Sequence, residues 1–196
     1  MSEKTPFQQV EEFHKIFDPR SPDVPTAFSK QAAIYRAEFK IEELVELIAA
    51  NCQGDQEQLH EGVTALHEAL EKAEQKMLTK KEWGQAPLIE QVDALTDLLY
   101  FTYGSFSLLG VDPTKIFEIV HQANMGKLFP DGKPHYHPVT NKVLKPDNWE
   151  EQCAPEPKIA KEIQRQIAQA TRRNSLEWTK QTKINRRFIL VMLFSR

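Results

Sequence analysis

The segment over residues 88–109 constrains the fold more than any other part of the 196-residue sequence. Apolar residues recur there at helical spacing and continue onto the other sides of the helix. They are Val92, Leu95, Leu98, Leu99, Phe101, Phe106, Leu108 and Leu109. Because a helix that is apolar almost all round is buried, the pattern predicts a central helix over residues 88–109. It also places two carboxylates, Asp93 and Asp97, away from open water.

A second helical pattern, over residues 27–51, carries three more carboxylates beside an apolar stripe. These are Glu42, Glu43 and Glu46, which are three or four residues apart and lie close on the helix surface. The three glutamates taken alone also fit a solvated helix face, since runs of charge usually mean exposure. That alternative stays open at this point.

The two segments together indicate a divalent-cation site. Carboxylates gathered away from water repel one another and lose hydration, which is costly unless protons or a cation neutralise them. Oxygen ligands without histidine or cysteine select magnesium, manganese or calcium. We therefore expect a metal site built by the acidic residues of both helices.

The rest of the chain adds helical patterns, few strand-like alternations and only 7 glycines. Helices are expected over residues 5–17, 27–51, 56–78, 88–109, 113–125 and 156–171. Gly110 suits a helix C′ position, Asp112 an N-cap and Pro113 a first helical position, so a tight corner joins two of these helices. Residues 128–157 are predicted to form an ordered loop or small hairpin without a helix. The expected fold is an all-α bundle of four to five helices with the acidic residues in its centre.

The composition of the chain limits which binding partners and which cellular compartment are expected. Residues 171–196, taken as a basic and apolar extension of a domain over residues 1–170, hold seven basic residues and one acidic residue. The preceding residues hold 18 basic and 27 acidic ones, which argues against nucleic acid as the main partner. A nucleotide remains compatible, because bound divalent cations reverse the local field. Two cysteines and no apolar run of membrane-spanning length lead us to expect a cytoplasmic protein without a membrane partner.

The apolar character of residues 88–109 also bears on assembly. A helix that is apolar on all sides needs more cover than one short bundle offers. We therefore predict a homodimer at least, with part of the site near the subunit interface.

Several motifs together resemble the all-α nucleoside triphosphate pyrophosphohydrolases, which include MazG, dimeric dUTPase and phosphoribosyl-ATP pyrophosphohydrolase. The similarity is strongest to the last branch and covers roughly residues 8–150. The motifs are the Glu-Glu-x-x-Glu run that begins at Glu42, the Asp97-Leu98-Leu99-Tyr100 run and the Asn124-Met125-Gly126-Lys127 run. One departure concerns the second acidic motif, usually Glu-x-x-Asp. Ala94 stands three residues before Asp97, so Asp93 is expected to take the role, with Glu90 as the less favoured substitute.

The resemblance implies an activity and a metal. Members hydrolyse a nucleoside triphosphate, or a related nucleotide, to a monophosphate and pyrophosphate, here in nucleotide-pool housecleaning. The implied cofactor is Mg²⁺, with Mn²⁺ as an alternative, held by Glu43, Glu46, Asp93 and Asp97. Glu42 is the candidate for orienting or deprotonating the attacking water.

The resemblance also implies substrate contacts. Asn124 and Lys127 are expected to hold phosphate or sugar, and Tyr100 to contact the substrate. His14 could contact the base, although it fits equally well as a residue that packs the bundle. Two other functions stay open: a phosphoribosyl-ATP pyrophosphohydrolase of histidine biosynthesis and a non-catalytic nucleotide-binding helical protein.

Overall fold

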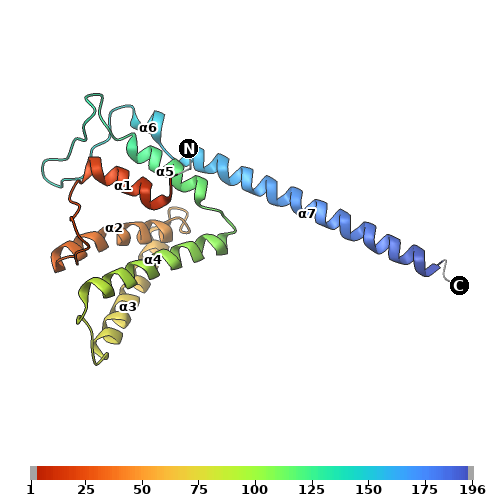
Figure 1. The fold of residues 1–196 in the computed structure, drawn as a ribbon, viewed down its shortest axis with the longest axis horizontal. Helices are drawn as coiled ribbons and strands as arrows, with labels where there is room; N and C mark the ends of the chain where they lie inside the picture. Colours follow the sequence, from red (N-terminus) through yellow and green to blue (C-terminus); the bar gives the residue numbers. More distant parts are fainter. Residues whose placement is uncertain (1–3, 194–196) are drawn as a thin grey trace. The chain divides into compact units, whose positions relative to one another are not determined.

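The structure of the protein is a computed structural model that describes the backbone of residues 4–193 and the side chains of residues 4–175 (Figure 1). In chain order its helices are α1 (Pro6–Phe17), α2 (Lys30–Ala49), α3 (Gln56–Leu78), α4 (Pro87–Leu109), α5 (Thr114–Met125), α6 (Trp149–Cys153) and α7 (Glu156–Leu193). The described residues form no strand beyond an isolated antiparallel bridge between Tyr136 and Val143. The predicted all-α class is confirmed.

The chain divides into two compact units. One unit is Pro22–Tyr100, and the other combines the residues up to Ser21 with those from Phe101 onward, so the division falls within α4. In the first unit α2 packs against α3, and in the second both α1 and α7 pack against α5. At the α2–α3 contact a Cβ on Gly62 would overlap the Ile48 side chain, so only glycine allows this close approach.

Local capping explains where the helices begin and end. The Thr5 hydroxyl and the Gln8 side chain form a reciprocal capping box at the start of α1. At the start of α3 the Asp55 carboxylate accepts the backbone N–H groups of Glu57 and Gln58. Gly110 follows α4 with a φ of +69°, as a C′ glycine should. The expected start of α5 was one residue early, because Pro113 is the N-cap and the helix begins at Thr114. Asp112 nevertheless accepts the Thr114 N–H, at 2.9 Å.

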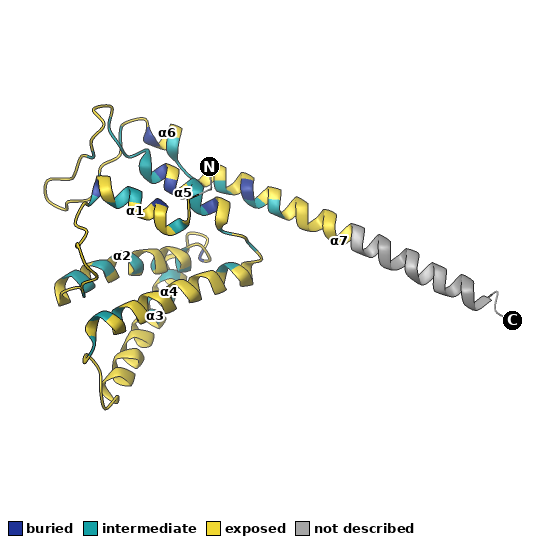
Figure 2. Ribbon diagram, viewed as in Figure 1, coloured by how far each residue is buried: buried dark blue, intermediate teal, exposed yellow. Residues whose placement is uncertain are grey.

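Two features differ from the sequence predictions. The segment predicted to lack a helix contains α6, whose Trp149 is buried. The predicted burial of α4 is wrong for a single chain, because none of its residues is buried and Leu99 is 61% exposed (Figure 2). The pattern identified an apolar helix correctly, but its apolar side chains are not buried in the structure.

The buried apolar side chains lie mainly in the unit that contains α1, α5 and α6. Among the described residues they are Phe17, Cys52, Ile116, Ala123 and Trp149, of which Cys52 alone belongs to the Pro22–Tyr100 unit. Phe13 stacks on Phe17 along α1 with ring centroids 4.2 Å apart. The helices that carry the acidic motifs therefore have little apolar core of their own.

Helix α7 begins where a helix was predicted and continues past residue 171, the predicted start of the C-terminal extension. Side chains from residue 176 onward lie outside the described part of the chain, so the apolar run predicted near the end stays a prediction. Over the described residues, no helix has both the length and the apolar character needed to cross a membrane.

Candidate active site on α2 and α4

The five candidate carboxylates lie on the two helices on which the sequence placed them, inside the Pro22–Tyr100 unit. All of them are exposed: Glu42, Glu43 and Glu46 on α2, and Asp93 and Asp97 on α4. The expectation that the two aspartates avoid water is wrong for the single chain, since the apolar residues around them are exposed too. Over the described residues, no group of three or more acidic, histidine or cysteine side chains lies close enough to hold a metal ion.

Glu90, the less favoured candidate for the second acidic motif, binds backbone groups instead. Its carboxylate accepts the Gly84 N–H at 2.8 Å and the Ala86 N–H at 3.0 Å, at the start of α4. These backbone bonds, that of Ala86 first, lower the pKa of Glu90. Glu90 therefore caps its own helix, and the expectation that Asp93 takes the role beside Asp97 stays a prediction.

A side-chain clasp links α4 to the segment that leads into α2. The Gln91 amide accepts the Phe28 N–H at 2.8 Å and donates to the Phe28 carbonyl at 3.2 Å. The Gln91 side chain therefore satisfies both backbone polar groups of Phe28, as a neighbouring strand would, and holds this residue beside α4. This contact joins residues 63 positions apart, and the sequence pattern gave no indication of it.

The remaining candidates divide between the two units. Tyr100 is 76% exposed at the end of the Pro22–Tyr100 unit, whereas His14, Asn124 and Lys127 belong to the other unit. The Lys127 ammonium donates to the Asn124 amide oxygen at 2.7 Å, so the structure brings these two residues together. His14 is half-buried and meets the Phe13 ring edge-on at 6.0 Å, which fits a packing role.

Helix α6 supports the Asn124–Lys127 pair and was missed by sequence reasoning. The buried Trp149 indole N–H donates to the Ala123 carbonyl at 2.9 Å, one residue before Asn124. Lys127 lies 6.0 Å from the centroid of the same indole ring. A tryptophan in a polar, proline-rich segment was the one available signal, because a buried indole N–H needs an acceptor.

Replacing Gly126 by alanine is expected to lower the free energy of unfolding by about 1–3 kcal/mol. A Cβ on Gly126 would lie 2.5 Å from the Cys153 sulfur and 3.1 Å from the Cys153 Cβ, which leaves no room for a methyl group. Adding Cys153→Ala removes the nearer atom and should restore part of the loss. Urea unfolding of both single variants and the double variant measures the coupling, and additive effects would contradict this close contact.

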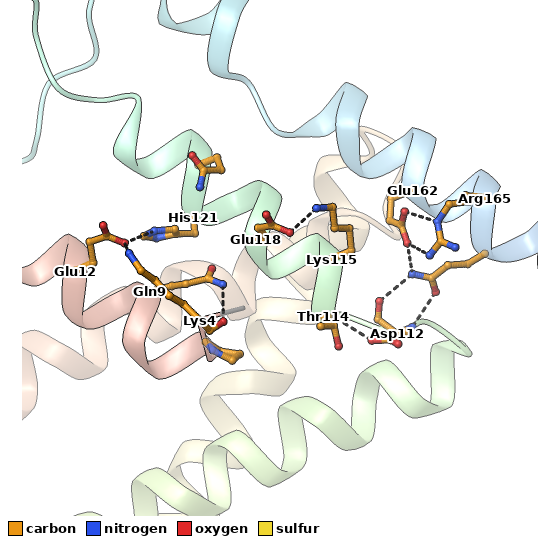
Figure 3. A pocket seen from close by; sticks show the side chains of 13 residues that line it. Lys4, Gln9, Glu12, Asp112, Thr114, Lys115, Glu118, His121, Glu162 and Arg165 are labelled. Carbon is orange, nitrogen blue, oxygen red and sulfur yellow. Dashed lines mark hydrogen bonds and ion pairs between the residues drawn. The ribbon is translucent and has the colours of Figure 1, made fainter. Parts of the chain in front are cut away.

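A charged pocket of about 500 Å³ lies in the unit that holds α1, α5 and α7 (Figure 3). Its acidic and basic lining residues are Glu12, Asp112, Glu118, Glu162, Lys4, Lys115, His121 and Arg165. Glu12 pairs with Lys4 at 2.7 Å and with His121 at 3.4 Å, and Lys115 pairs with Glu118. Four carboxylates face three lysine or arginine cations and one histidine, so the pocket has no excess of positive charge that would favour an anion.

Within this pocket, Glu162 is the most perturbed carboxylate. The Arg165 guanidinium donates to it twice, at 2.7 and 2.5 Å, and the Gln166 amide once, at 3.0 Å. These bonds, led by that of Arg165, lower the pKa of Glu162 from 4.5 to about 2. Between a pH of about 2 and about 4.5, the Glu162 carboxylate is therefore mostly ionised in the folded chain and mostly protonated in the unfolded chain.

Replacing Arg165 by glutamine should remove a pH-dependent part of the stability. A carboxylate with a depressed pKa stabilises the fold fully above about 4.5, and this contribution is lost as the pH falls toward about 2. The difference in free energy of unfolding between wild type and Arg165→Gln should be largest above that window and shrink within it. Arg172→Gln, on the same helix, is the control. A difference independent of pH would contradict the assignment.

Comparisons with known proteins agree with the motifs on α2 and α4. Residues 10–124 match the family model of phosphoribosyl-ATP pyrophosphohydrolase. This range contains all five carboxylates, together with His14, Tyr100 and Asn124, and it ends before Lys127. No curated protein matches the chain.

A solved structure extends the similarity beyond that range. The crystal structure of a protein from Exiguobacterium sp. 255-15, described as a candidate NTP pyrophosphohydrolase, matches with a TM-score of 0.77 and 35% sequence identity. The match covers 86% of this chain and 99% of the other. With the family model matching more than half of the sequence, the chain belongs to the phosphoribosyl-ATP pyrophosphohydrolase-like family of all-α NTP pyrophosphohydrolases.

Proposed function

We propose that the protein is a Mg²⁺-dependent pyrophosphohydrolase that cleaves a nucleoside triphosphate, or a related nucleotide, to a monophosphate and pyrophosphate. The observation that carries the proposal is the set of exposed carboxylates on α2 and α4 within the family-matched range. Within the described part of the chain, no cationic side chain forms an ion pair with Glu43, Glu46, Asp93 or Asp97. Their charge is therefore left for an added cation.

The chemistry of these side chains fits Mg²⁺. All four are hard oxygen donors, and neither histidine nor cysteine accompanies them on α2 or α4 near the motifs. A bound Mg²⁺ would neutralise phosphate oxygens and make a water molecule more acidic. Mn²⁺ has similar preferences and is expected to substitute.

Side chains of the protein supply the other roles. Glu42, on the same helix as the ligand candidates Glu43 and Glu46, would orient the attacking water and accept its proton, as a carboxylate can in general base catalysis. The Lys127 ammonium would bind a phosphate and the Asn124 amide a phosphate or sugar oxygen, since their mutual hydrogen bond already fixes both groups. Tyr100 is proposed to contact the substrate.

We further propose that a second copy of the chain covers α2 and α4. Their exposed apolar side chains include Leu44, Leu47, Val92, Leu95 and Leu99. A water-exposed apolar surface on this scale marks an interaction site, and the acidic residues lie on the same two helices. In a homodimer or higher oligomer, carboxylates near the interface would lose contact with water, as the sequence pattern predicted.

A nucleotide panel tests the activity. The protein is incubated with each common ribo- and deoxyribonucleoside triphosphate and with phosphoribosyl-ATP, in Mg²⁺ and separately in EDTA, and pyrophosphate is measured. Turnover of triphosphates that depends on Mg²⁺ is expected. Turnover of phosphoribosyl-ATP alone would favour the role in histidine biosynthesis, and nucleotide binding without turnover would favour a non-catalytic binding protein. A nucleotide substrate would also agree with a cytoplasmic location.

A further inference from the structure

A buried amide oxygen in the charged pocket between α1, α5 and α7 has no hydrogen-bond partner (Figure 3). It is the Oε1 atom of Gln9, a residue of α1 that lines the pocket and is only 9% exposed. The Gln9 Nε2 donates to the Lys4 carbonyl at 3.1 Å, which fixes the orientation of the amide and leaves Oε1 as an acceptor. Because an unpaired buried acceptor is costly, the pocket favours a ligand that donates an N–H or O–H group.

The charges in the pocket indicate that this donor is a cation. Among the described residues that line the pocket, carboxylates outnumber lysines and arginines by four to three. A carboxylate has about four acceptor directions, so Glu12 and Glu118 can accept further hydrogen bonds besides those from their lysine partners. Over the described residues no group of side chains is arranged to hold a metal ion, so an organic ammonium group fits the pocket better than a metal.

Acceptors lie at two ends of the pocket (Figure 3). Gln9 and Glu12 lie at one end, where Glu12 meets His121 of α5, and Asp112 lies at the other end, where it meets Thr114 of α5. Thr114 and His121 are seven residues apart in this helix, which corresponds to a rise of about 10 Å. A ligand that reaches both ends therefore needs two ammonium groups separated by about that distance.

The Asp112 end is fixed before any ligand binds. The Gln166 side chain of α7 accepts the Asp112 N–H at 2.9 Å and donates to the Asp112 carbonyl at 2.9 Å. Hydrogen bonds with Thr114, that of its side chain first, lower the pKa of Asp112, so the carboxylate is ionised at neutral pH. Groups that are already held in place lose less entropy when a ligand binds.

We propose that this pocket binds a linear polyamine, with one ammonium group donating to Gln9 and Glu12 and a second donating to Asp112. The volume of about 500 Å³ is typical of small-molecule sites and leaves room for the methylene chain along α5. All three residues belong to the unit that excludes residues 22–100, so the polyamine site shares no residue with the carboxylates of α2 and α4. It therefore does not depend on the proposed function.

The experiment titrates spermidine into the full-length protein by calorimetry, in buffer that contains Mg²⁺. One spermidine is expected to bind per chain. Butylamine, which has a single ammonium group, should bind at least about tenfold more weakly, because it loses the charge-assisted hydrogen bonds at one end. Tetramethylammonium carries the same charge as butylamine but donates no N–H, so it should give no binding heat.

Substitutions at both ends locate the bound polyamine. Asp112→Asn keeps an oxygen that can accept the Thr114 N–H but removes the charge, and it should weaken spermidine binding about tenfold. Gln9→Met keeps a side chain of similar length without the amide oxygen, and it should weaken binding by about three- to tenfold. Glu156→Gln is the matched control, because Glu156 is an exposed carboxylate of α7 that does not line the pocket.

Asp97→Asn separates this site from the candidate active site and should bind spermidine as tightly as wild type. Binding that is lost in Asp97→Asn but kept in Asp112→Asn would place the polyamine on α2 and α4 and overturn the proposal. Absence of spermidine binding, or equal binding of tetramethylammonium, would overturn it as well. Spermidine binding that depends on Asp112, in a protein that hydrolyses no nucleotide, would support the polyamine site and remove the enzymatic function alone.

Discussion

Replacing Asp97 by asparagine, or Glu46 by glutamine, is expected to reduce Mg²⁺-dependent hydrolysis at least about a hundredfold. Changing residues that only support a metal ligand costs about 10- to 100-fold in affinity or activity, and loss of a ligand charge should cost at least as much. Each substitution keeps the size and shape of the side chain, so the helical content should not change. Initial rates over a Mg²⁺ titration, with circular dichroism of the same samples, measure both effects.

The same variants should not be less stable than wild type in the absence of metal. Each removes one carboxylate from a group of like charges, so the apo protein should unfold at the same temperature or a higher one. Glu61→Gln, on an exposed position of α3, is the matched control and should keep wild-type activity. Wild-type activity in Asp97→Asn would remove this residue from the metal site, and lost helical content would show that the carboxylate supports the fold instead.

Replacing Leu99 by glutamate is expected to convert the oligomer to a monomer and to abolish activity. Leu99 is 61% exposed in the single chain, and a buried leucine contributes about 1.5–3 kcal/mol when it leaves water. In a symmetric dimer both copies lose that contribution, and each places a carboxylate at an apolar contact. Sedimentation velocity at micromolar concentration measures the assembly, and the rate on the best nucleotide measures the site.

A control for this substitution must change an exposed apolar residue outside α2 and α4. Val139 is 86% exposed in the segment between α5 and α6, and Val139→Glu should leave both assembly and activity unchanged. Wild-type protein that sediments as a monomer at micromolar concentration would contradict the proposed oligomer. An active monomeric Leu99→Glu variant would show that assembly and chemistry are separate.

The helices could be predicted from the sequence because their causes are local. The spacing of apolar residues identifies the helical segments. Capping residues such as Asp55 and Gly110 determine where a helix begins or ends, and they lie within one turn of that end. Predicted and observed bounds of α3 agree at both ends, from residue 56 to 78. The acidic motifs could be placed on α2 and α4 for the same reason.

Contacts between distant residues could not be predicted in this way. The Gln91–Phe28 clasp and the Trp149–Ala123 hydrogen bond depend on how segments meet, and neither is implied by periodicity. Helix α6 is only 5 residues long, too short to show a period, and it is stabilised by the burial of Trp149. The prediction that α4 is buried was wrong for another reason.

An apolar pattern predicts that a helix surface is covered, but it does not say whether the same chain or a second copy would cover it.

The position of phosphorus–oxygen bond cleavage tests the central claim most directly. Hydrolysis of the best nucleotide is carried out with Mg²⁺ in water enriched in ¹⁸O, and the products are examined by ³¹P NMR. We expect the nucleoside monophosphate and intact pyrophosphate as the only phosphorus products, with ¹⁸O incorporated into one of the two in each turnover. Release of orthophosphate and a nucleoside diphosphate, or no Mg²⁺-dependent turnover of any nucleotide in the panel, would contradict a pyrophosphohydrolase built on the carboxylates of α2 and α4.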